Sequence, residues 1–172
     1  MNDSDQKVHP FISYLISLSE SEDRGALAEL RRGLGKTPGT VPEMYRYVMP
    51  WISADTSRKQ EFTYFLIAAL FAYHPKHTNK GNMGDHLALT RESYSSDDAL
   101  DRRFTHLLAS HPDDLPTYLQ QAIGLLKSKG EIAVNWNQLL KDLRYWDHPD
   151  KFAQKQWARS FWGFRKMASE ES

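Results

Sequence analysis

The sequence predicts an all-α fold, in which two packed helical subdomains form a compact bundle of about eight or nine helices. Apolar residues recur every three or four positions along most of the chain, which is the spacing of a buried helix face. No segment alternates apolar and polar residues as a half-buried strand would. The 172 residues are enough to bury a sizeable core.

Three apolar stripes predict helices in the first part of the chain, over residues 8–16, 26–30 and 62–73. The second helix is followed by a basic turn in which Gly33 or Gly35 supplies the left-handed backbone that ends helices. Prolines in the connections mark further boundaries, several of them suited to a first helical turn.

The polar loop 75–84 is the best internal division, because it has little apolar content and separates two helical regions. The helices expected after it cover residues 85–94, 100–108, 115–126, 136–143 and, as a looser aromatic stripe, 152–164. We therefore expect an N-terminal helical subdomain with its connecting loop at residues 1–94 and a C-terminal helical bundle at 95–172.

The basic turn contains Gly35-Lys36-Thr37, which looks like the end of a phosphate-binding P-loop. A P-loop needs a further glycine five positions earlier, where this chain has Leu30, and it must follow a buried strand. Here a helical stripe precedes the turn, and Pro38 prevents a helix from continuing after it. The sequence thus argues against a nucleotide site.

Composition restricts the remaining function classes. The formal net charge is +0 and 40% of residues are hydrophobic, which is typical of a folded domain and argues against a disordered charged tail. The absence of cysteine excludes disulfides, thiol nucleophiles and thiolate metal sites. No apolar run approaches the length of a membrane span and the first residues lack the cationic start of a signal peptide, so a cytoplasmic protein without a membrane partner is expected.

Three catalytic or regulatory alternatives fit poorly. A metal site from His74, His77 and His86 is disfavoured by the proline after His74 and by nearby lysines. The pairs Arg102–His106 and Arg144–His148 approximate the arginine–histidine motif of HEPN-type ribonucleases, but their spacing is one residue short of it. A helix-turn-helix regulator needs a basic recognition helix, and none is evident. We expect no cofactor and no catalytic residue.

Two His-Pro-Asp tripeptides, at residues 111–113 and 148–150, each precede an expected helix. Proline and aspartate both favour the first turn of a helix, so we interpret these tripeptides as helix-start signals.

Cations, in contrast, are concentrated in part of the chain. Residues 24–80 hold nine lysines and arginines and four acids, and most cations of the chain fall in expected helix ends or loops, where they can share a surface. Such a track neutralises phosphates without reading bases. The candidate nucleic-acid-binding residues are Arg31, Arg32, Lys36, Arg58, Lys59, Lys76, Lys80, Arg102, Arg103 and Arg144. Solvated surface charge is the alternative interpretation.

Several sequence features follow one another in a characteristic order. An arginine pair and glycine-rich turn are followed by the aromatic-rich segment 42–51, by Arg58-Lys59-Gln60-Glu61, by the apolar helix at 64–73 and by Asp101-Arg102-Arg103-Phe104. This order resembles the CasB family, the small subunits of the type I-E CRISPR effector complex Cascade. The resemblance extends over nearly the whole chain.

The resemblance implies a non-catalytic subunit, present in two copies, that contacts other Cascade subunits and the guide RNA complex and helps to hold single-stranded non-target DNA. The matching basic positions are Arg31 or Arg32, Arg58, Lys76 or Lys80, Arg102 or Arg103, and Arg144. Unpaired bases could stack on Tyr45, Trp51, Trp146 and Trp162, although their spacing favours core positions. A pure assembly scaffold remains the competing hypothesis.

Overall fold

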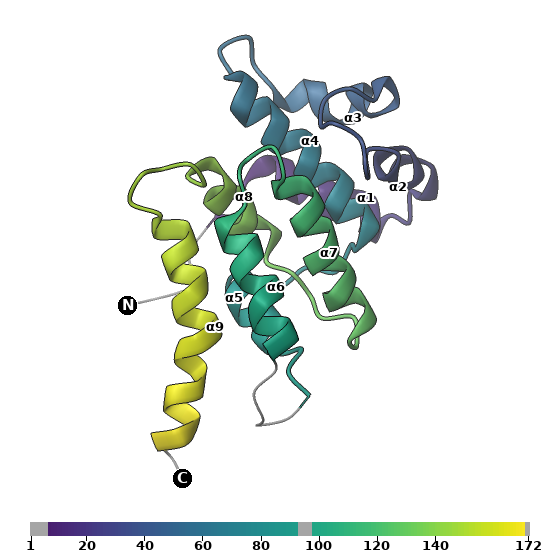
Figure 1. The fold of residues 1–172 in the computed structure, drawn as a ribbon. Coiled ribbons are helices and arrows are strands. Elements are labelled where there is room, and N and C mark those ends of the chain that lie inside the picture. The colour runs from purple at the N-terminus through teal and green to yellow at the C-terminus, as the bar shows by residue number, and fades with distance from the viewer. Residues whose placement is uncertain (1–6, 93–97, 171–172) are drawn as a thin grey trace. The chain divides into compact units, whose positions relative to one another are not determined.

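The computed structural model describes residues 7–92 and 98–170, with side chains described as far as residue 163 (Figure 1). These residues form nine α-helices and two short 3-10 helices, and their only β-type pairing is one isolated bridge between His77 and Val134. The predicted all-α fold is confirmed. No helix in the described ranges is both long and apolar enough to cross a bilayer.

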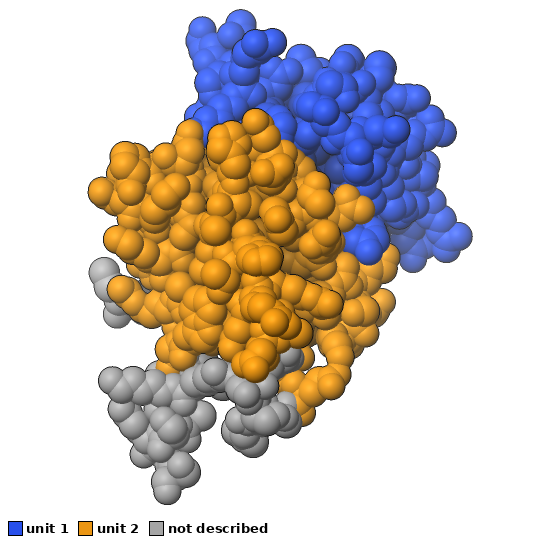
Figure 2. Space-filling model, in the orientation of Figure 1, with its two compact units in different colours: residues 1–75 blue, residues 76–172 orange. Residues whose placement is uncertain are grey.

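The chain divides into two compact units, residues 1–75 and 76–172 (Figure 2). The second unit begins within the polar loop that the sequence singles out as an internal division. The subdomain boundary expected between residues 94 and 95 lies outside the described residues.

The first unit is built around one central helix. Its helices are α1 (Pro10–Glu20), α2 (Arg24–Arg31), η1 (Pro42–Met44), α3 (Tyr45–Val48), η2 (Met49–Trp51) and α4 (Arg58–Tyr73). Every residue of α4 from Thr63 to Ala72 is buried, as expected for a helix surrounded on all sides. The Ser57 hydroxyl caps α4 by accepting the N–H of Gln60 at 3.2 Å.

The turn after α2 explains its glycines. Gly35 has a φ of 73°, the left-handed conformation predicted for one of the two glycines, and Lys36 follows it. Gly33 has another role, because a Cβ there would lie 2.6 Å from the Met44 sulfur and 3.1 Å from the Ala69 Cβ. Gly33 therefore allows the end of α2 to approach α4 closely. Since helix α2 directly precedes the turn, the turn lacks the preceding strand that a P-loop requires.

The second unit contains α5 (Met83–Ala88), α6 (Asp98–Ala109), α7 (Leu115–Ser128), α8 (Trp136–Arg144) and α9 (Phe152–Glu170). Helix α5 packs directly on α9, since a Cβ at Gly84 would lie only 2.0 Å from the Trp157 carbonyl oxygen. The helix expected at residues 85–94 is wrong at its C-terminal end. It stops at Ala88, where the Thr90 N–H bonds the Leu87 carbonyl at 3.0 Å in a tight turn.

The two His-Pro-Asp tripeptides form the same local structure. The imidazole Nδ1 of His111 accepts the N–H of Asp113 at 3.2 Å, and that of His148 accepts the N–H of Asp150 at 3.1 Å. Each tripeptide precedes a helix, as predicted, but histidine rather than aspartate supplies the hydrogen-bond acceptor.

Candidate nucleic-acid interface

The cations around the turn after α2 differ in their surroundings. The guanidinium of Arg31 donates to the Ala72 carbonyl at 3.3 Å, at the end of α4. Arg32 forms an exposed ion pair with Glu43 at 3.2 Å. Lys36 is exposed, and no carboxylate of the described residues pairs with it. Of these three cations, Lys36 has its charge most available to an external anion.

Arg58 and Lys59 form the first turn of α4, at the opposite end of this helix from Ala72. Ala72 lies 14 positions after Arg58, which corresponds to about 21 Å of helix at 1.5 Å per residue. Both side chains are exposed, and Arg58 has no ion pair within the described part of the chain. The fold thus places the first unit's predicted cations in two groups, one at each end of α4.

In the second unit, Lys76 and Lys80 project from the loop before α5. Lys76 lies 3.6 Å from a carboxylate oxygen of Glu131, with both side chains largely exposed. Lys80 is exposed and makes no ion pair with any described residue. Backbone contacts hold the loop in place, because the Lys76 carbonyl accepts both the Val134 N–H at 3.0 Å and the Trp136 indole N–H at 3.1 Å.

The remaining predicted cations lie on α6 and α8. Arg102 and Arg103 are consecutive exposed residues of α6, and neither pairs with a carboxylate in the described ranges. Arg144 is the last residue of α8 and is only partly exposed, with a buried Nε. The structure therefore distributes the second unit's candidates over three places: the loop, α6 and the end of α8.

The proposed stacking residues are mostly engaged within the fold. Trp146 is 2% exposed, its ring packs 4.9 Å from that of Trp157, and its indole N–H donates to a backbone carbonyl, so it takes the core position that its spacing favours. Trp51 packs 5.2 Å from the Tyr14 ring. Tyr45 is 39% exposed, but its hydroxyl donates to a backbone carbonyl at 2.9 Å.

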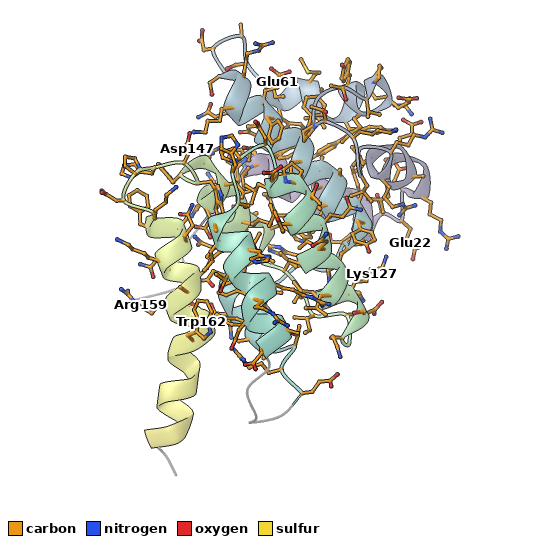
Figure 3. All side chains as sticks on the ribbon, viewed as in Figure 1. Glu22, Glu61, Lys127, Asp147, Arg159 and Trp162 are labelled. Atoms are coloured by element: carbon orange, nitrogen blue, oxygen red, sulfur yellow. The ribbon has the colours of Figure 1, made fainter. Side chains whose placement is uncertain are left out.

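Trp162 completes a polar cluster between α6 and α9. Its indole N–H donates to Asp101 at 3.2 Å, and the same carboxylate oxygen accepts a hydrogen bond from Arg91 at 3.1 Å. Figure 3 shows Trp162 directed from α9 toward α6, whereas Arg159 on the same helix points away from the bundle. Trp162 thus contributes to internal packing in the second unit.

Further exposed cations lie outside the predicted set. Lys151 directly precedes α9, Lys155 and Arg159 lie in the first half of that helix, and none of the three has an ion pair with a described residue. Two aromatic side chains near them, Tyr145 and Phe152, are 53% and 41% exposed. The sequence gives only a weak indication of this surface, because its aromatic stripe at residues 152–164 combines Phe152 with core residues.

Two side chains that could suggest a metal site, His86 and Asp85, have structural partners. His86 is 4% exposed and its Nε2 accepts the Asn135 N–H at 3.0 Å, while burial lowers its pKa to about 4. Asp85 accepts the Asn82 N–H at 2.9 Å in the capping box of α5. Among described residues, no group of three or more potential ligands is arranged to hold a metal ion.

Residues 26–162 of the chain match the family described as CRISPR-associated protein Cse2. The chain belongs to the Cse2 family. A curated relative, the CRISPR-associated protein Cse2 of Thermus thermophilus, is 31% identical over 153 residues, covering 85% of this chain and 82% of the relative. The resemblance to CasB inferred from the sequence is thereby confirmed.

Solved structures agree with this family assignment. The crystal structure of M. ruber CasB matches with a TM-score of 0.77 and 29% identity, covering 96% of this chain and 98% of that one. A chain in a CRISPR RNA-guided surveillance complex has the same fold, with a TM-score of 0.72 and 20% identity over 94% of this chain and 98% of its own length.

Proposed function

We propose that this Cse2 protein is a non-catalytic small subunit of a type I-E CRISPR Cascade surveillance complex, where it holds the displaced non-target DNA strand and so stabilises the R-loop. The guide–target duplex is about as stable as the DNA duplex that it replaces, so even weak binding of the displaced strand shifts the equilibrium toward the open R-loop. Family membership and the fold shared with a chain of a surveillance complex support this assignment.

The observation that carries the proposal is that five of the predicted cations are exposed and lack an ion pair within the described residues. They are Lys36, Arg58, Lys80, Arg102 and Arg103. Arg58 is especially informative, because a cation in the first turn of a helix opposes the helix dipole and so does not serve the stability of α4. Its charge remains available to an external phosphate.

The partners in this proposal are a second copy of the chain, the other Cascade subunits with their guide RNA, and single-stranded non-target DNA. The contacts to DNA involve phosphates, so binding is insensitive to sequence and weakens with salt. Each phosphate contact contributes about −0.7 to the log–log slope of affinity against salt for a single strand.

The decisive experiment measures the lifetime of R-loops in reconstituted Cascade with a triple variant, Arg58→Ala, Arg102→Ala and Arg103→Ala. We expect the variant to incorporate fully into the complex and its R-loops to dissociate faster. The log–log slope of strand affinity against salt should become shallower by about two units. The matched control, Lys151→Ala with Lys155→Ala and Arg159→Ala, removes the same charge from α9 and the residue before it and should leave the lifetime unchanged. Equal effects of both variants would contradict a role for the specific residues.

Two further outcomes address the alternatives. If Arg58→Glu prevents incorporation into the complex, the charge serves assembly and the scaffold hypothesis is favoured. Arg102 and His106 are both exposed and one turn apart on α6. RNA cleavage by the purified chain that disappears in His106→Ala would contradict the non-catalytic part of the proposal.

A further inference from the structure

A pocket of about 460 Å³ lies in the second unit, with walls from α5, α6 and α7. Its volume is within the range of small-molecule sites. Helices α6 and α7 contribute most of the lining, and Leu87 of α5 contributes to it as well. Arg103, one of the candidate phosphate-binding residues, is part of this lining, so the pocket adjoins the proposed strand-binding surface.

The apolar part of the pocket is firmly supported. Phe104 is 1% exposed, and its ring packs 4.1 Å from Phe161 and 5.1 Å from Trp162, both on α9. Leu107 beside it is 2% exposed. Side chains held in this way have few alternative rotamers, so the apolar wall is preformed and an occupant does not have to order it.

The polar part of the pocket has mixed hydrogen-bonding character. Arg103 and His106 come from α6, whereas Tyr118 and Gln121 come from α7. Together they offer a guanidinium, an imidazole, a phenol hydroxyl and a carboxamide, which can both donate and accept hydrogen bonds. No described carboxylate pairs with the guanidinium of Arg103.

We propose that this pocket receives one unpaired nucleobase of a single-stranded nucleic acid, with an adjacent phosphate on Arg103. The inference rests on the proposed function and adds to it a specific base-binding site. A nucleobase matches the pocket in three respects: its faces are apolar like the pocket wall, its edges both donate and accept hydrogen bonds, and the phosphate attached to its nucleotide is an anion that Arg103 can bind.

An apolar side chain of a neighbouring subunit is the competing occupant. It would fill the floor beside Leu107 but would leave the carboxamide of Gln121 and the guanidinium of Arg103 without partners at a closed interface. Polar groups desolvated without a hydrogen bond oppose binding. The charge and polarity of the rim therefore favour the nucleobase.

The test exploits the fixed register that guide pairing imposes on the displaced strand. Single abasic sites are placed one at a time along the non-target strand, and R-loop lifetimes are measured in reconstituted Cascade. Loss of a stacked base should shorten the lifetime about five- to tenfold at one position per copy of the chain and leave most other positions unchanged. A flat scan would overturn the pocket proposal.

Two variants assign the effect to the pocket. Leu125→Trp fills the pocket from α7, and Gln121→Leu removes the carboxamide at an exposed position. With either variant, the R-loop lifetime should no longer depend on the position of the abasic site. Gln156→Leu makes the same chemical change at an exposed position of α9 outside the pocket and should preserve that dependence. If the Leu125→Trp and Gln121→Leu variants instead fail to incorporate into the complex, the pocket contacts a neighbouring subunit and the nucleobase proposal is wrong.

The outcomes also separate this inference from the proposed function. A flat abasic scan in a complex whose R-loop lifetime still depends on Arg58 and Arg102 removes the base pocket and retains phosphate binding. Lifetimes that respond neither to abasic sites nor to those cations would remove both.

Discussion

The buried neutral histidine of the second unit should make the stability of the chain depend on pH. The Nε2 of His86 accepts the Asn135 N–H at 3.0 Å, and Asn135 in turn caps α8 and donates from its side chain to the Gly81 carbonyl at 3.0 Å. Protonation of Nε2 would remove the acceptor and place a charge in a site that is 4% exposed. The nearby Asp85 only partly opposes the effect of burial on the pKa.

The magnitude follows from the difference between the two states. The His86 pKa is about 4 in the folded chain and 6.5 when solvated, so the unfolded chain binds more protons between these values. The stabilising contribution is fully present above pH 6.5 and falls as pH decreases toward 4. The whole interval corresponds to about 3 kcal/mol, and the part lost between pH 8 and pH 5 is about 2 kcal/mol.

The assay is urea unfolding of the purified chain at pH 8, 7, 6 and 5, compared with His86→Gln. The glutamine carbonyl can still accept the Asn135 N–H but does not titrate in this range. We expect the wild type to lose about 2 kcal/mol more than the variant between pH 8 and pH 5. Parallel stability curves for the two proteins would refute the assignment of a neutral, buried His86.

Four further substitutions test the packing and capping of the fold that supports the site. Gly84→Ala places a Cβ 2.0 Å from the Trp157 carbonyl oxygen and should prevent α5 from packing on α9, which a large decrease in the thermal midpoint would reveal. Gly25→Ala introduces a Cβ that meets nothing closer than 3.7 Å and should stabilise the chain by about 0.5–1 kcal/mol. Ser57→Ala removes the cap of α4 and should cost about 1 kcal/mol in chemical denaturation. Trp157→Phe removes the indole N–H that the Asp142 carboxylate accepts at 2.7 Å. Burial raises the pKa of Asp142 and this hydrogen bond lowers it, so NMR titration of the carboxyl should show a still higher pKa in the variant.

Most of the helical architecture could be predicted from sequence, because a buried helix face leaves a periodic pattern. The stripe at residues 115–126 lies within α7, and that at 136–143 lies within α8. The end of α5 could not be predicted in this way. An apolar residue, Leu89, still follows Ala88, but the Thr90 hydroxyl and N–H both bond the Leu87 carbonyl and close a turn.

The candidate site was less accessible to sequence analysis, because the environment of a charge depends on residues far away in the chain. Lys76 pairs with Glu131, which lies 55 positions later, and Arg91 pairs with Asp101 across residues outside the described ranges. For Trp146, by contrast, residue type allows stacking on a base but the spacing favours a core position, and the side chain is buried in the second unit. The pocket beside Arg103 depends on side chains that only the packing of α6 and α7 brings together.

These pairings determine which substitutions can test strand binding. Replacing Arg32 with alanine removes a cation but also releases the carboxylate of Glu43, which would then repel a phosphate. Weaker strand binding by that variant would therefore not establish that Arg32 contacts the DNA. Arg58 and Arg102 have no such partner among the described residues, so their replacement removes only the positive charge. A loss of R-loop lifetime in those two variants, with incorporation intact, can therefore be assigned to the missing cation itself.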